Sequence, residues 1–156
     1  MFNKVPRGSI NHSLLDSIVF FLRSMVANLS DSQKITEFED LFAANNDRRF
    51  CVSFPFARTA IYFALKAKNL PKGSEVIMPP ISIKGILDVV VSLGLVPKYV
   101  DLDLETFCFD PVLLKEAVNK NTSAVIITYL FGTAPDLDEI IDICRAQNIY
   151  IIEDFS

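Results

Sequence analysis

Residues 124–154 read AVIITYLFGTAPDLDEIIDICRAQNIYIIED, and this stretch decides the fold. Its two ends, 124–129 and 150–152, are short and almost continuously apolar, which is typical of strands buried on both faces of a sheet. The middle, 137–147, repeats apolar side chains at helical spacing: Leu137, Ile140, Ile141 and Cys144. A strand, a helix and a second strand in this order predict parallel strands joined by a helix.

The same alternation extends back to residue 50. Short apolar runs and helical stripes predict further strands at 50–54, 75–78 and 98–100, and helices at 57–68, 82–93 and 111–118. The fold class is therefore α/β: three layers, with a mostly parallel sheet of about five strands between helices.

Two helices precede the α/β region, at 14–29 and 35–44, where apolar side chains recur at helical spacing. Residues 1–47 are therefore expected to form an N-terminal helical arm. Residues 48–156 are expected to form the sheet domain.

Composition and charge exclude several classes of function. The 15 basic and 19 acidic residues give a net charge of −4 without a basic cluster, which excludes a nucleic-acid surface. His12 is the only histidine, so no Cys/His zinc spacing occurs and no metal site is expected. Cys51, Cys108 and Cys144 are expected to be reduced thiols of a cytoplasmic protein. The apolar stretch 14–29 carries charges and is shorter than the ~20 residues that span a bilayer, so no membrane span is expected.

Three segments follow predicted strands, at the sheet edge where doubly wound folds bind ligands. SFPFARTA at 53–60 enters a helix, so its first-turn amides can bind phosphate. MPPISI at 78–83 leaves its strand extended and can press a side chain against a flat ligand. IED at 152–154 ends on a carboxylate that can bind a metal, a ribose hydroxyl or a protonated ring nitrogen. On local grounds, a plain strand-to-helix turn and a capped helix start are the favoured interpretations of the first two segments. A structural cap explains the third segment equally well.

Five segments in register carry a family resemblance: FPFARTAIYFAL at 54–65, KGSEVIMP at 72–79, GLVPKYVDLD at 94–103, YLFGTAPDLD at 129–138 and IIED at 151–154. The chain resembles the N-terminal part of the DegT/StrS group of sugar aminotransferases, which are pyridoxal-phosphate enzymes of fold type I. The resemblance implies that 48–156 is the N-terminal part of the cofactor-binding large domain, an incomplete one.

The resemblance assigns cofactor-binding roles to three residues. Arg58 and Thr59 occupy the positions whose backbone amides hold the cofactor phosphate. Asp154 corresponds to the carboxylate that pairs with the pyridinium nitrogen and keeps it protonated. Ile83 falls where many members place an aromatic ring on the cofactor, so this chain departs from the family there.

The Schiff-base lysine of the family lies further along the chain than the equivalent of Asp154. Every lysine here, from Lys4 to Lys120, precedes Asp154, so no catalytic residue is assigned. Lys84 is the one amine near the stacking position, and a lysine at a helix start is usually solvated. The chain is therefore expected to be truncated before the catalytic lysine.

The resemblance implies transfer of an amino group from a donor such as glutamate to a nucleotide-linked keto sugar, in modified-sugar or surface-polysaccharide synthesis. The chain is expected to be an N-terminal fragment that is inactive alone, and to form a homodimer or pair with the missing C-terminal part. A non-catalytic interaction protein that keeps the aminotransferase dimer surface is the main alternative. An unrelated nucleotide-binding domain ranks last, because no Gly-x-Gly-x-x-Gly follows any predicted strand.

The resemblance also implies an order for the strands, in which the first is separated from the fifth by two strands that come later in sequence. Residues 50–54 would then lack a neighbour, while the other four strands could still pair. We expect 50–54 to be displaced from the sheet or joined to the strand at 150–152. An unpaired strand also predicts a marginally stable, aggregation-prone monomer.

Overall fold

The computed structural model describes residues 13–26, 32–130, 133 and 137–155. The chain divides into two compact units, residues 1–53 and 54–156, and each is described by itself.

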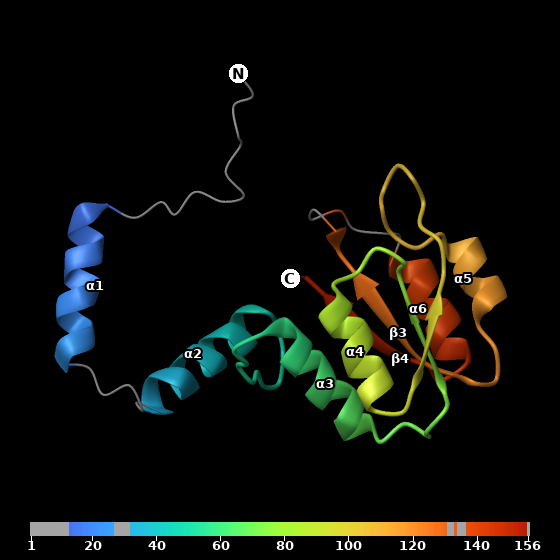
Figure 1. The fold of residues 1–156 in the computed structure, drawn as a ribbon, viewed down its shortest axis with the longest axis horizontal. Coiled ribbons are helices and arrows are strands. Elements are labelled where there is room, and N and C mark those ends of the chain that lie inside the picture. Colours follow the sequence, from blue (N-terminus) through green and yellow to red (C-terminus); the bar gives the residue numbers. More distant parts are fainter. Residues whose placement is uncertain (1–12, 27–31, 131–132, 134–136, 156) are drawn as a thin grey trace. The chain divides into compact units, whose positions relative to one another are not determined.

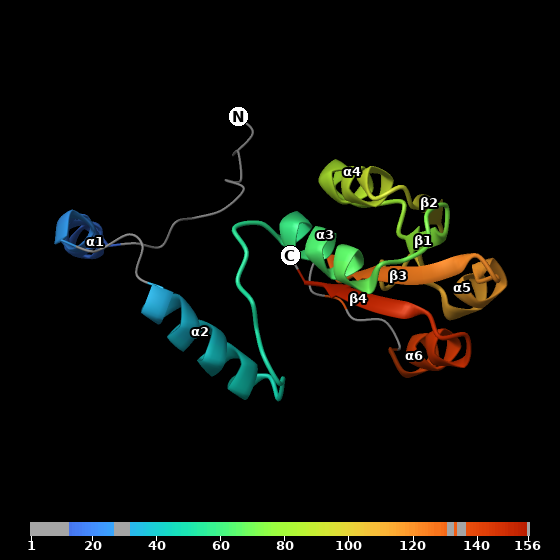
Figure 2. The same ribbon diagram turned by 90° about the horizontal axis from the view of Figure 1, so that it is seen from below.

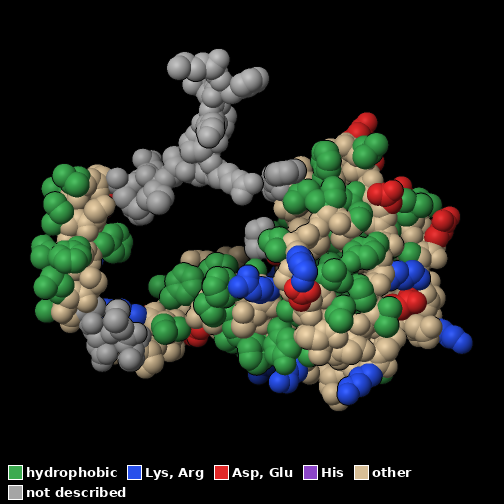
Figure 3. Space-filling view, viewed as in Figure 1, with side chains coloured by type: hydrophobic (Ala, Val, Ile, Leu, Met, Phe, Trp, Pro, Cys, Tyr) green, Lys and Arg blue, Asp and Glu red, His purple; other side chains and the backbone are tan. Residues whose placement is uncertain are grey.

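The first unit contains helices α1 (Leu14–Val26) and α2 (Ser32–Asn45). Ser13 and Asp16 cap the start of α1 reciprocally: the Asp16 amide donates to Ser13 Oγ at 3.1 Å, and the Ser13 amide donates to Asp16 Oδ2 at 3.1 Å. None of the α1 side chains is buried, and apolar side chains cover much of this helix (Figure 3). The part of the predicted helix beyond residue 26 lies outside the described residues.

The strand predicted at 50–54 is wrong. These residues have no regular secondary structure, and Phe50 and Val52 are 74% and 63% exposed. An apolar alternating pattern forms a strand only where a neighbour pairs with its backbone groups, and the sheet offers this segment none. The sheet therefore has four strands rather than about five. Residues 50–54 are not part of the sheet, so the expected pairing with the last strand is not observed.

The sheet lies in the second unit and is entirely parallel. Its strands are β1 (Glu75–Met78), β2 (Val96–Tyr99), β3 (Thr122–Thr128) and β4 (Tyr150–Asp154). Their order is β2-β1-β3-β4, so each pair of neighbours needs a helical crossover (Figure 1). β4 pairs with β3 alone among the described strands. The predicted α/β class and the predicted pairing of the last four strands are confirmed.

Four helices supply the outer layers of this unit: α3 (Ala57–Lys68), α4 (Lys84–Ser92), α5 (Pro111–Ala117) and α6 (Leu137–Ala146). α3 and α4 cover one face of the sheet, and α5 and α6 cover the other (Figure 2). Asp110 caps α5, with its side chain accepting from the Val112 amide at 2.8 Å. Gly94 follows α4 with a φ of +73°, which suits glycine.

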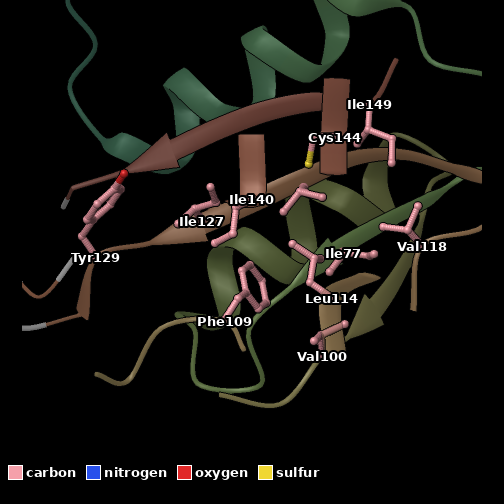
Figure 4. Close-up of a cluster of buried hydrophobic side chains, with 11 residues drawn as sticks. Ile77, Val100, Phe109, Leu114, Val118, Ile127, Tyr129, Ile140, Cys144 and Ile149 are labelled. Carbon is pink, nitrogen blue, oxygen red and sulfur yellow. The ribbon is translucent and has the colours of Figure 1, made fainter. Parts of the chain in front are cut away.

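The alternation of side chains along the strands produces two separate cores. On β3, Val125 and Ile127 face α5 and α6, in the cluster drawn in Figure 4. Ala124 and Ile126 face α3 and α4 instead. Because the side-chain period of a strand is two, Thr128 must follow Ile126 onto the α3 and α4 face.

Candidate functional site

Two polar side chains end neighbouring strands at the carboxyl edge of the sheet. Thr128 of β3 and Asp154 of β4 are register partners. Asp154 follows the buried Ile152 at a spacing of two, so both polar side chains face α3 and α4. Asp154 is only 5% exposed, which is rare for an aspartate and requires partners or a ligand.

A cavity of about 250 Å³ opens between this edge and the start of α4. Three polar residues line it together with four apolar ones: Ser82, Thr128, Asp154, Ile81, Ile83, Ile86 and Leu130. The side-chain oxygens of Ser82 and Thr128 are fully buried and have no hydrogen-bond partner. A mostly apolar cavity lined by a few polar residues is typical of a small-molecule site.

A second cavity, of about 300 Å³, lies between α3 and β4. The small side chains of Ala57, Ala60 and Ala64 form its α3 wall, and Asp154 lines it as well. Asp154 therefore lines both cavities.

Tyr129 contacts the residues before and after Asp154 at the end of β4. Its hydroxyl donates to Glu153 Oε2 at 2.6 Å, and its ring stacks on Phe155 with 4.1 Å between centroids. The Tyr129 amide also donates to the Asp154 carbonyl at 2.9 Å. Burial, the hydrogen bond to Glu153 and the charge of that carboxylate all raise the pKa of Tyr129. The phenol therefore stays protonated and remains a donor.

The first turn of α3 carries the two predicted phosphate-binding residues. Its N-cap, Phe56, makes no side-chain cap bond, and the Thr59 amide donates to the Phe56 carbonyl at 3.0 Å. The Arg58 guanidinium lies 4.3 Å from the centre of the Phe56 ring. A Cβ added to Gly85 would meet Arg58 Cδ at 3.0 Å, so the starts of α3 and α4 are in contact. The structure thus brings this turn beside the site, while a phosphate-binding role stays a prediction.

Lys84 does not reach the site. Its ammonium pairs with Asp88 at 2.7 Å, and its side chain is 81% exposed. Among the described residues, no lysine lines either cavity, and no group of His, Cys, Asp or Glu is arranged to hold a metal. Ile83 lines the first cavity, at the position where the resemblance expects an aromatic ring.

The sequence did not predict the buried, unpaired hydroxyls of Ser82 and Thr128 or the contacts that Tyr129 makes at the end of β4. Thr128 could have been found, because it ends a buried strand just as Asp154 does. The position of Ser82 predicted another role, because a serine directly before a helix is typical of an N-cap. In the structure the N-cap of α4 is Ile83, without a side-chain cap bond.

A parallel sheet with helices on both faces defines a doubly wound α/β domain, a class of fold that binds ligands at the carboxyl edge of its sheet. The chain belongs to the DegT/DnrJ/EryC1/StrS aminotransferase family, which it matches over residues 21–156. The predicted family is confirmed.

Three similar proteins illustrate the match. The spore coat polysaccharide biosynthesis protein SpsC of Bacillus subtilis is 32% identical, over 81% of this chain and 32% of its own length. The 3-oxo-glucose-6-phosphate:glutamate aminotransferase of Bacillus subtilis is also 32% identical, over 97% of this chain and 36% of its own length. The structure of E. coli GDP-4-keto-6-deoxy-D-mannose-3-dehydratase with bound hydrated PLP superposes with a TM-score of 0.79 at 28% identity, over 95% of this chain and 39% of that one.

The chain therefore spans about a third of the length of these relatives. No described helix has both the length and the apolarity needed to cross a bilayer. All three cysteines are free, and Cys108 and Cys144 are buried in the core.

Proposed function

We propose that this chain forms the N-terminal part of the cofactor domain of a pyridoxal-phosphate aminotransferase that acts on nucleotide-linked keto sugars. The family membership supports the reaction class, and the sugar-related names of its relatives support the substrate class. Because the chain spans only about a third of the length of those relatives, the aminotransferase reaction of the complete enzyme is itself a proposal.

The observation that carries the proposal is Asp154, a buried residue that lines both cavities. A carboxylate beside a pyridine nitrogen favours the protonated ring. When bound, pyridoxal phosphate supplies an electron sink that stabilises a substrate carbanion, and a protonated ring nitrogen strengthens that sink. In this proposal Asp154 holds the proton on the ring nitrogen.

The remaining residues of the site fit such a ligand. Apolar walls suit the faces of a flat ring. Ile83 would pack on the ring where other members use an aromatic side chain. The first-turn amides of Arg58 and Thr59 would hold the phosphate, which requires the Thr59 amide to leave the Phe56 carbonyl.

We further propose that these 156 residues alone do not turn over. No described lysine lines either cavity, so no amine is placed to anchor the cofactor or to move a proton. An active site would then require a further polypeptide segment or a partner subunit, in a homodimer or in a pair with a C-terminal part.

Titration of the purified chain with pyridoxamine phosphate tests the proposal, with calorimetry as the readout. Asp154→Asn should weaken binding roughly 10-fold, because a charge-assisted contact contributes about 1.5–3 kcal/mol. Asp142→Asn, an exposed aspartate on α6, is the matched control and should bind like the wild-type chain.

Equal binding by wild type and Asp154→Asn would contradict the cofactor role of Asp154. Absence of binding, combined with stable association with a complete family member, would instead favour the non-catalytic interaction protein.

A further inference from the structure

Tyr129 contacts each of the three consecutive residues at the end of β4, 153–155. Its hydroxyl donates to Glu153 Oε2, its amide donates to the Asp154 carbonyl, and its ring stacks on the Phe155 ring. Among the described strands, β4 has β3 as its single neighbour. Because a strand end with a neighbour on one side frays readily, these contacts restrain the backbone that carries the Asp154 side chain.

Tyr129 makes these contacts from the face of the sheet opposite to the Asp154 side chain. It belongs to the buried cluster that faces α5 and α6 (Figure 4), whereas Asp154 follows Ile152 onto the α3 and α4 face. Asp154 lines both cavities, and Tyr129 lines neither. A ligand in these cavities therefore reaches Asp154 without touching the phenol.

The hydroxyl of Tyr129 is not needed to fill the core. The ring is buried, and a phenylalanine ring would occupy nearly the same volume. The hydroxyl bonds instead to the carboxylate of Glu153, an exposed residue directly before Asp154. Burial and this carboxylate raise the pKa of Tyr129, so the phenol keeps its proton and stays a donor at neutral pH. The contacts with Glu153 and Phe155 thus hold both flanks of Asp154 before a ligand enters.

We infer that Tyr129 is a positioning residue, which orients Asp154 toward the ligand through Glu153 and Phe155. This assignment rests on the proposed function, in which Asp154 pairs with the ring nitrogen of the cofactor. A carboxylate that is already oriented loses less conformational entropy when it contacts the ring, so the ligand binds more tightly. Tyr129 then contributes to affinity only through Asp154.

Titration with two ligands distinguishes positioning from a general loss of structure. Tyr129→Phe should weaken binding of pyridoxamine phosphate about 3-fold, because one flank of Asp154 is released. An analogue with carbon in place of the ring nitrogen cannot pair with Asp154, so it should bind wild type and Tyr129→Phe equally, within about 1.5-fold. In the Asp154→Asn background, Tyr129→Phe should also change the affinity for pyridoxamine phosphate by less than about 1.5-fold.

Hydrogen exchange tests the restraint without any ligand. The amide at position 129 donates to the Asp154 carbonyl, so its exchange reports opening of the end of β4. In Tyr129→Phe this amide should exchange roughly 3- to 10-fold faster, the effect of losing one hydrogen bond.

Two control variants separate positioning from other effects of substitution. Tyr150→Phe makes the same change at the other end of β4 and keeps the ring contact with the Lys68 ammonium at 4.3 Å. Thr122→Val removes a hydroxyl that accepts from the Asn119 amide at 3.1 Å, so it should lower the Tm. Both variants should bind pyridoxamine phosphate like the wild-type chain.

Each outcome decides the assignment. If Tyr129→Phe binds pyridoxamine phosphate as tightly as wild type, or weakens binding of both ligands equally, the positioning role is overturned and the proposed function stands. An unchanged exchange rate at position 129 overturns the positioning role as well. Absence of binding by the wild-type chain overturns the proposed function and the positioning role together.

Discussion

The two edges of the sheet differ in the hydrogen bonding of their polar side chains. At the amino edge, the polar groups of β1, β2 and β3 are bonded to one another. At the carboxyl edge, two hydroxyls are buried without a partner beside a buried carboxyl. The paired network distinguishes a structural end of the sheet from the end at which we propose that the ligand binds.

The amino edge is organised around Glu75 at the start of β1. Its Oε2 atom accepts from Asn119 Nδ2 at 2.8 Å, from Lys98 Nζ at 3.2 Å and from Thr122 Oγ1 at 3.4 Å. Lys98 Nζ also donates to the Ala117 carbonyl at 2.7 Å. Burial acts to raise the pKa of Glu75, but hydrogen bonds from Asn119 and Lys98 and the charge of Lys98 outweigh it and hold the pKa below 4.5.

Removing the centre of the amino-edge network should have the largest effect on stability. Glu75→Ala removes the carboxylate that the partly buried ammonium of Lys98 and the side-chain amide of Asn119 share, and should cost about 1.5–3 kcal/mol of unfolding free energy. Urea unfolding measures it, with Glu116→Ala, an exposed glutamate on α5, as the control. A cost equal to that of the control would show that the network is not structural.

The same network should make stability depend on pH. Because the pKa of Glu75 is lowered in the folded state, its contribution is present above its ordinary pKa of 4.5 and is lost as the pH falls through the lower folded value. The difference in Tm between wild type and Glu75→Gln should therefore shrink as the pH falls from about 6 to about 3. If this Tm difference instead grows as the pH falls, the pKa of Glu75 is not lowered in the folded state.

Removing the Tyr129 hydroxyl at the carboxyl edge should have a smaller effect on unfolding free energy. Tyr129→Phe keeps the stacking on Phe155 but removes the hydrogen bond to Glu153, at a cost of about 0.5–1.5 kcal/mol. Binding of pyridoxamine phosphate should weaken only a few-fold, because Asp154 itself is retained. Complete loss of binding would mean that Tyr129 contacts the ligand directly.

The smallest effect is expected for Lys84→Gln. This lysine forms an exposed i,i+4 pair with Asp88, so unfolding free energy should change by less than about 0.5 kcal/mol. Borohydride reduction of the wild-type chain with pyridoxal phosphate should trap no stoichiometric adduct at Lys84. Such an adduct would overturn the assignment of this lysine to the surface.

The periodicity of apolar residues correctly predicted the helices and strands whose bounds depend on local sequence. α3 and β1 begin and end at the predicted residues, 57–68 and 75–78. The segment 50–54 failed because a strand depends on a neighbour as well as on its own pattern. The sequence could not show that the hydroxyls of Ser82 and Thr128 are unpaired, because the pairing of a hydroxyl depends on packing between segments that are distant in sequence.

The most direct measurement is a titration of the isotope-labelled chain with pyridoxamine phosphate, followed residue by residue through NMR amide shifts. We expect the shifts to concentrate at the carboxyl edge, in 82–86 and 153–155, and expect no shifts in 74–75 and 119–122 at the amino edge. At a ligand concentration equal to the wild-type Kd, Asp154→Asn should reduce the shifts about 5-fold, because it binds roughly 10-fold more weakly. Shifts confined to the amino edge, or unchanged shifts in Asp154→Asn, would contradict the assignment of the carboxyl edge as the binding end.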